Sequence, residues 1–119
     1  MNHLEIEYGA LTPRSYEIRL KGTLGMESVR SLEHVFQKVF EQGVFQIVVN
    51  MEKLSYICSR GIGVLVSSYD KAVSSGGDIV IAAVGPSTQA VFDLIGLAKV
   101  IKFAPNTAKA SGLLGKPQN

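Results

Sequence analysis

Cysteine is scarce in this sequence, since Cys58 is the one cysteine among 119 residues. A single thiol excludes an internal disulfide and any metal site built from several cysteines. No apolar run approaches the roughly 20 residues that a membrane-spanning helix needs. The first residues also lack the basic and apolar segments of a signal peptide. From these absences we expect a soluble, cytoplasmic protein.

An excess of charge of one sign is also lacking. The formal net charge is +2, and the basic residues are scattered along the chain. Nucleic-acid-binding domains gather basic residues on one face, so we expect no nucleic-acid partner. The two histidines, His3 and His34, stand far apart in the sequence, and no pair of histidines or carboxylates supports a hydrolase or a metal site. We therefore predict a protein that is not an enzyme and holds no metal or cofactor.

The length and the 46% hydrophobic content fit one compact domain over residues 1–119. Alternating apolar and polar residues predict strands over residues 4–8 and 16–21, joined by a turn within residues 9–14. Helical spacing of apolar residues predicts helices over residues 27–42 and 59–74 and a short one around 90–95. Further strands are predicted over residues 44–49, 78–84 and 100–103. From about residue 105 we expect a loose tail, with a marginal helix over residues 107–114 as an alternative.

The chain is organised around residues 54–65, which join a buried strand to a helix. Ser59 stands at the predicted start of that helix, and Gly61 and Gly63 follow it. Backbone N–H groups at a helix N-terminus favour negative charge, so a phosphorylatable hydroxyl is well placed there. The alternative is that Ser59 only caps the helix, with its oxygen accepting a backbone N–H.

Three segments resemble the STAS domain of bacterial anti-sigma factor antagonists, the sporulation type in particular. They are residues 22–24, 54–65 and 91–97, in the family's order and at similar spacing. The resemblance implies an α/β fold with a mixed four- to five-stranded sheet and helices mainly on one face. It also implies that the chain binds an anti-sigma factor of the serine-kinase type and so releases a sigma factor. Ser59 aligns with the serine that this partner phosphorylates.

Two positions depart from the family pattern. The residue before the acceptor serine is usually aspartate, and here it is Cys58. A second family aspartate, in the turn after the second strand, aligns with Gly25. If those carboxylates orient the hydroxyl or take up its proton, phosphate transfer to Ser59 should be impaired. Binding to the partner need not be, which leaves a phosphorylation-independent signalling module as an alternative.

The predicted contact surface centres on the segment before the second helix, with the preceding turn at its rim. Its members are Gly25, Met26, Tyr56, Ile57, Cys58, Ser59, Arg60, Gly61, Ile62 and Gly63. Exposed residues of the short helix near residues 91–97 are also candidates.

Two other functions remain open. One is a regulatory subunit of a lipid-exporting ABC transporter. The other is a redox sensor based on Cys58, for which the alternative is a small apolar residue half-buried in the loop. Arg60 either pairs with an acidic partner or phosphate or is simply solvated. A homodimer is also consistent with the sequence.

Overall fold

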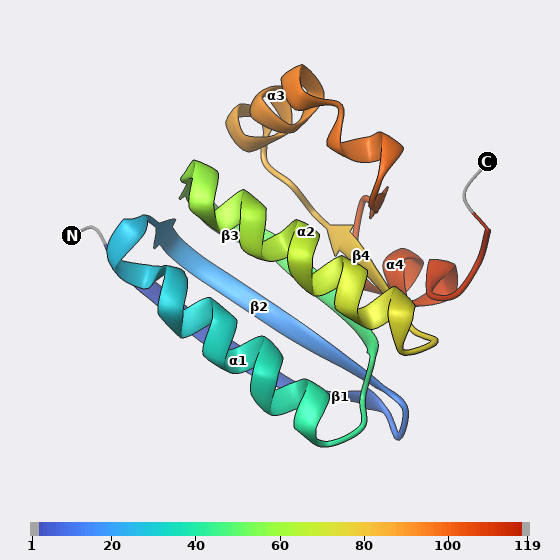
Figure 1. Cartoon of the computed structure of the whole chain (residues 1–119). Coiled ribbons are helices and arrows are strands. Elements are labelled where there is room, and N and C mark those ends of the chain that lie inside the picture. The colour runs from blue at the N-terminus through green and yellow to red at the C-terminus, as the bar shows by residue number, and fades with distance from the viewer. Residues whose placement is uncertain (1–2, 118–119) are drawn as a thin grey trace.

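The computed structural model describes residues 3–117. It contains one five-stranded sheet in the spatial order β1-β2-β3-β4-β5. The first two strands form an antiparallel hairpin, and the other neighbouring pairs are parallel (Figure 1). The sheet elements are β1 (Leu4–Thr12), β2 (Ser15–Leu24), β3 (Gln46–Ile57), β4 (Asp78–Ala82) and β5 (Lys102–Ala104). The helices are η1 (Met26–Ser28), α1 (Val29–Glu41), α2 (Ser59–Ser74), α3 (Pro86–Ile95), η2 (Leu97–Lys99) and α4 (Thr107–Leu113).

Helices α1 and α2 form where apolar residues recur at helical spacing. In α1 the buried side chains are Val29, Leu32, Phe36 and Val39, which lie on one face. The helix ends at Glu41, and Gly43 follows with a φ of 77°, a left-handed conformation that glycine adopts without steric cost. Helix α2 begins and ends at the residues that the sequence predicts.

The sheet buries both of its faces to different extents. Alternate strand residues such as Ile47, Val49 and Ile79 pack under α1, α2 and α3 and form the main core. The residues between them, Val48 and Val80, form a smaller core on the opposite face. Helix α4 covers that second core, whereas α1 and α2 lie together on the first face (Figure 1). The predicted mixed sheet with helices mainly on one face is confirmed.

In place of the predicted loose tail from residue 105, the structure shows the alternative, a helix within residues 107–114, which is α4. Helix α4 packs on the sheet with Ala110 fully buried. The Lys102 ammonium group lies 2.6 Å from the carboxylate of Asp78 and also donates hydrogen bonds to the carbonyl oxygens of Leu113 and Lys116. The segment lacks a broad apolar stripe, so its order depends on distant polar groups that sequence periodicity cannot detect. Residues 118–119 of the predicted tail lie outside the described residues.

Several predicted boundaries also differ. Strand β1 continues to Thr12, so the turn lies at residues 13–14. Strand β3 is predicted over residues 44–49 but runs from Gln46 to Ile57. Its second half is mostly polar and pairs with β2 through two register shifts. Such irregular pairing blurs the alternation by which a strand is recognised. Strand β4 ends at Ala82, and β5 begins at Lys102.

A buried carboxylate on β2 joins helix α4 to strands β2 and β3. Glu17 accepts hydrogen bonds from Thr107 at 2.7 Å, Asn50 at 3.0 Å and Arg19 at 2.7 Å. Burial acts to raise the pKa of Glu17, but these hydrogen bonds outweigh it and hold the pKa below the ordinary value of 4.5. The ionised form of Glu17 therefore ties α4 to strands β2 and β3.

We expect Glu17→Gln to lower the free energy of unfolding by about 2 kcal/mol at neutral pH, because charge-assisted hydrogen bonds are lost. A lowered folded-state pKa gives stability that is present above the unfolded value and is lost as the pH falls. The difference between the two proteins should thus shrink as the pH drops below about 4.5. Urea unfolding across that range measures it, with Glu52→Gln on the exposed surface of β3 as the control. An equal difference at every pH would contradict the assignment.

Candidate functional site

The ends of β2 and β3 bring the predicted site residues together. Thr23 lies opposite Tyr56 and Leu24 opposite Ile57 in the parallel pairing. The backbone N–H of Cys58 then donates to the carbonyl of Leu24 at 2.9 Å. Because both chains leave the sheet at this point, the turn at residues 25–26 lies beside the start of α2. The two predicted halves of the contact surface are therefore neighbours.

Ser59 is the first residue of α2, and Cys58 is its N-cap. The expectation that Ser59 caps the helix is therefore wrong, and no side-chain cap is formed. Within residues 3–117 the Ser59 hydroxyl has no hydrogen-bond partner, and the residue is exposed. The N–H groups of the first helical turn are free of intrahelical partners. A phosphate on this hydroxyl would stand where those groups favour negative charge.

The ten predicted contact residues divide into an outer and an inner set. The outer residues are exposed and consist of Met26, Tyr56, Ser59, Arg60 and Gly63, with Ile62 half-buried beside them. The inner residues are buried and consist of Gly25, Ile57, Cys58 and Gly61. A partner that docks here would touch the outer residues. The buried inner residues hold the backbone that carries the outer residues in place.

Gly61 is buried because α2 approaches β2 closely at that point. A Cβ atom at Gly61 would lie 2.8 Å from the side chain of Leu24 and 3.0 Å from that of Ile57. A Cβ atom at Gly63 would meet nothing within 4 Å. The two glycines therefore have different roles, although the sequence spacing treats them alike.

This difference predicts opposite effects on stability. Gly61→Ala should lower the free energy of unfolding by about 1–2 kcal/mol, because the added methyl group overpacks the core. Gly63→Ala should raise it by up to about 1 kcal/mol, because alanine favours helix more than glycine does. Thermal and urea unfolding of the two variants, each the control for the other, measure the effect. Changes of the same sign would contradict the packing at Gly61.

An acidic group that the sequence argument missed lies beside Gly25. The family aspartate is absent at Gly25, but the carboxylate of Glu27 occupies the space above it. A Cβ atom at Gly25 would lie 3.0 Å and 3.2 Å from the two carboxylate oxygens of Glu27. Because η1 turns back over Gly25, an acid two residues later reaches the place where an aspartate side chain would begin. The sequence feature that could have indicated this acid is Glu27 itself, two residues after Gly25. An alignment that compares only the residue at position 25 with the family aspartate does not detect it.

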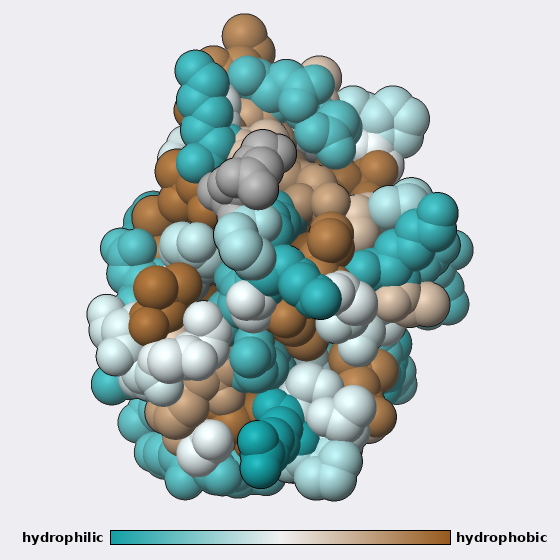
Figure 2. Space-filling model, turned by 90° about the vertical axis from the view of Figure 1, so that its right-hand side faces the viewer, coloured by the Kyte–Doolittle hydropathy of each residue, from teal (hydrophilic) through white to brown (hydrophobic). Residues whose placement is uncertain are grey.

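Helix α3 adds apolar surface to the same end of the sheet. It follows β4 and lies at the end where α2 begins (Figure 1). Leu94 is 88% exposed and Ile95 is 54% exposed, compared with 59% for Met26 and 52% for Tyr56. Figure 2 shows apolar residues at the top of the molecule, where α3 lies in Figure 1. We call the exposed side chains that these elements carry at this end of the sheet, Met26, Tyr56, Leu94 and Ile95, together with Ser59, the strand-end surface.

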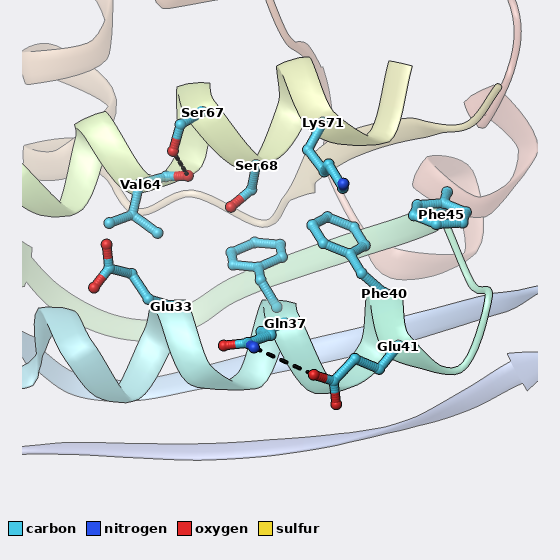
Figure 3. Close-up of a pocket in the computed structure, with 10 residues that line it drawn as sticks. Glu33, Gln37, Phe40, Glu41, Phe45, Val64, Ser67, Ser68 and Lys71 are labelled. Carbon is cyan, nitrogen blue, oxygen red and sulfur yellow. Dashed lines mark hydrogen bonds between the residues drawn. The ribbon is translucent and has the colours of Figure 1, made fainter. Parts of the chain in front are cut away.

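A groove of about 440 Å³ lies elsewhere, between α1 and α2. Phe40 stacks on Phe45 at a centroid distance of 5.3 Å along it, and Glu41 and Lys71 stand at its rims (Figure 3). None of the predicted contact residues lines this groove. It is therefore a separate feature from the strand-end surface.

Cys58 and Arg60 contribute differently to the site. Cys58 is a free thiol with 9% of its surface exposed, and it packs within the main core. Reactive cysteines are usually more accessible, so this placement favours the packing role over the redox sensor. Arg60 is exposed and makes no ion pair among the residues that the structure describes. Its guanidinium group is available to an acidic partner.

Metal-ligand clusters and membrane-spanning helices are both absent from residues 3–117. No three His, Cys, Asp or Glu side chains there are grouped so that they could hold a metal ion. No helix in that range is long and apolar enough to cross a membrane.

Comparison with known proteins places the fold. A model of the STAS domain matches residues 11–110. The anti-sigma-B factor antagonist of Staphylococcus aureus is 29% identical over 92 residues, which cover 77% of this chain and 85% of that protein. The crystal structure of a putative anti-sigma factor antagonist from Thermotoga maritima has a TM-score of 0.83 at 19% identity and covers 90% of this chain and 92% of that one. The phosphorylated form of the Bacillus cell fate determinant SpoIIAA has a TM-score of 0.69 at 25% identity, over 84% of this chain and 91% of that one.

Proposed function

Because this chain belongs to the STAS domain family, we propose that it is an anti-sigma factor antagonist that binds a kinase-like anti-sigma factor and so releases a sigma factor. The staphylococcal relative is named as an antagonist of this kind. The observation that carries the proposal is the exposed, unbonded Ser59 hydroxyl at the start of α2, at the end of the sheet where neighbouring elements also carry exposed apolar side chains. We place the interaction in the cytoplasm, where sigma factors act.

The strand-end surface has the composition of a protein contact. Methionine, tyrosine and arginine are enriched in interfaces, and Met26, Tyr56 and Arg60 are all exposed there. Burying Leu94 and Ile95 together with these residues would remove apolar surface from water. The net charge of +2 offers no comparable attraction for nucleic acid. A protein partner is therefore the occupant that this surface suits.

Phosphorylation of Ser59 supplies the switch in this proposal. The hydroxyl oxygen attacks the γ-phosphorus of ATP held by the partner, ADP leaves, and the hydroxyl proton passes to a carboxylate. The chain is a substrate, and the nucleotide belongs to the partner. The product carries about −1.5 to −2 charges at neutral pH. Helix α2 tolerates that charge at its N-terminus, whereas an apolar contact surface does not.

Glu27 affects whether Ser59 can still accept a phosphate group. Cys58 and Gly25 replace the two family aspartates, which favours a phosphorylation-independent antagonist as the second candidate. The Glu27 carboxylate next to Gly25 restores an acid on that side of the acceptor. We propose that Glu27 orients the Ser59 hydroxyl or takes up its proton in the complex. This replacement supports the phosphorylation switch, whereas binding to the partner does not depend on it.

The test is to recover the complex from native cell extract with the tagged full chain, add ATP and measure intact masses. A kinase-like anti-sigma factor and one added phosphate, lost in Ser59→Ala, would support the switch. The same partner with no phosphate would support the phosphorylation-independent antagonist. Subunits of an ABC transporter in its place would overturn the sigma-factor proposal and leave the fold unaffected.

A further inference from the structure

Strand β1 leaves one edge of the sheet open. It has nine residues and, within the part of the chain that the structure describes, pairs on one side only, with β2. The opposite edge strand, β5, has three residues and contacts α4. No proline interrupts β1 between Leu4 and Thr12. A long edge strand of this kind presents unpaired N–H and C=O groups that can pair with another strand.

The pairing with β2 shows which backbone groups of β1 are free. Leu4 lies opposite Gly22, so His3 lies opposite Thr23, whose N–H donates to the His3 carbonyl at 3.0 Å. In an antiparallel pair, directly opposed residues alternate between hydrogen-bonded and non-hydrogen-bonded pairs. Alternate residues after His3 therefore direct their backbone groups toward β2. The residues whose N–H and C=O groups face away from the sheet are Leu4, Ile6, Tyr8 and Ala10.

We propose that β1 pairs antiparallel with β1 of a second copy of this chain, about a two-fold axis at Tyr8. In this register Tyr8 lies opposite the partner's Tyr8, and Ile6 lies opposite the partner's Ala10. Every one of these residues has outward-facing backbone groups, so the central part of the contact forms about six hydrogen bonds. The side chains of Leu4 and Ile6, which pack against the main core, stay on the helix-covered face across the junction.

Charge selects this register. Glu7 lies on the open face of β1, where it contacts Arg19 at 3.5 Å. In the Tyr8-centred register Glu7 lies opposite the partner's Gly9, which carries no charge. A register centred on Glu7 would set two glutamates directly opposite each other, which is destabilising. In a register centred on Gly9, Ile6 would lie opposite the partner's Thr12. The register of β1 shifts between Ala10 and Thr12, so hydrogen bonds would be lost there.

The dimer would form one ten-stranded sheet from two five-stranded ones. Antiparallel pairing directs the two strand-end surfaces away from each other, because each lies at the carboxyl ends of its own parallel strands. Both surfaces stay free, so the dimer presents two binding sites. The dimer is inferred from the edge strand alone and does not rest on the proposed function.

A charge pair at Gly9 tests the register. A Cβ atom at Gly9 would meet nothing within 4 Å, so a side chain fits in the monomer. Gly9→Glu sets an acid opposite the partner's Glu7 and should weaken dimerisation about tenfold, whereas Gly9→Lys should strengthen it about tenfold. Sedimentation velocity over a concentration series of the full chain measures both. Since Glu17 lies opposite Gly9 within the chain, thermal unfolding of each variant as a monomer records any effect on the fold.

A backbone variant gives an independent test. Ala10→Pro removes an outward N–H group without removing a hydrogen bond to β2, and it should shift the dimer to monomer. Ala10→Ser keeps that N–H group and should remain dimeric. Monomeric behaviour of the unmodified chain and of Gly9→Lys at all concentrations would overturn the proposal. A dimer whose dissociation constant is the same in Gly9→Glu, Gly9→Lys and Ala10→Pro would also overturn it.

Discussion

Ser59→Asp should weaken binding of this chain to its anti-sigma factor by about a hundredfold or more. The aspartate places a charge at the centre of the strand-end surface, where docking would bury it without a partner. The free protein should be unaffected, because Ser59 is exposed, its hydroxyl makes no hydrogen bond among the described residues, and it stands at a helix N-terminus. Isothermal titration calorimetry with the purified anti-sigma factor measures the loss.

Ser74→Asp is the matched control for that variant. Ser74 is exposed and is the last residue of α2, at the opposite end from Ser59. The same added charge at this site should change the dissociation constant by less than about threefold. If Ser59→Asp binds as tightly as the unmodified chain, the strand-end surface is not where the partner docks.

Glu27→Gln should slow phosphorylation of Ser59 in the complex by about a hundredfold, the range expected when a general acid–base or positioning carboxylate is removed. Partner affinity should change little, because glutamine keeps the shape of the side chain. Single-turnover phosphate transfer and calorimetry separate the two effects. Glu33→Gln, an exposed position on α1, serves as the control for loss of one negative charge.

A second variant tests whether a carboxylate attached at residue 25 can replace the carboxylate of residue 27. Gly25→Asp in a Glu27→Ala background returns a carboxylate to the space that the Glu27 side chain then leaves empty, and the φ of −101° at Gly25 suits an aspartate. We expect it to restore much of the phosphorylation rate. Normal phosphorylation of Glu27→Gln alone would show that the acid comes from elsewhere in the complex.

The sequence predicted best those elements whose stability comes from a regular apolar face. Helix α2 was predicted with its observed bounds, and the buried stripe of α1 was identified from its spacing. Both helices bury large apolar side chains at regular intervals, and such periodicity is local information. The order of strands and helices alone is compatible with several sheet topologies. The resemblance to a known family indicates which of them applies.

Elements held by distant polar contacts were predicted less well. Thr107 and Glu17 are 90 positions apart in the sequence, yet their hydrogen bond helps to fix α4 on the sheet. The sequence pattern predicts a loop for the second half of β3, because its polar residues pair with β2 through shifted registers. The local preference of a segment for helix or strand does not depend on such distant partners, so it cannot predict these contacts.

At the candidate site, sequence reasoning located the right segment but not the role of each residue. It identified the start of α2 and the turn at Gly25, which the structure places side by side. It could not separate the buried Gly61 from the exposed Gly63, since that difference depends on the approach of Leu24. It also treated the acid at Gly25 as lost, because the return of η1 that carries Glu27 over Gly25 is a three-dimensional feature.

Release of a sigma factor in a purified system tests the central claim most directly. A preformed complex of the kinase-like anti-sigma factor with a labelled sigma factor is titrated with this chain, and free sigma factor is followed by fluorescence anisotropy. We predict stoichiometric release by the unmodified chain and little release by Ser59→Asp at the same concentration. No release by the unmodified chain at any concentration, with the anti-sigma factor competent to bind its sigma factor, would contradict the account.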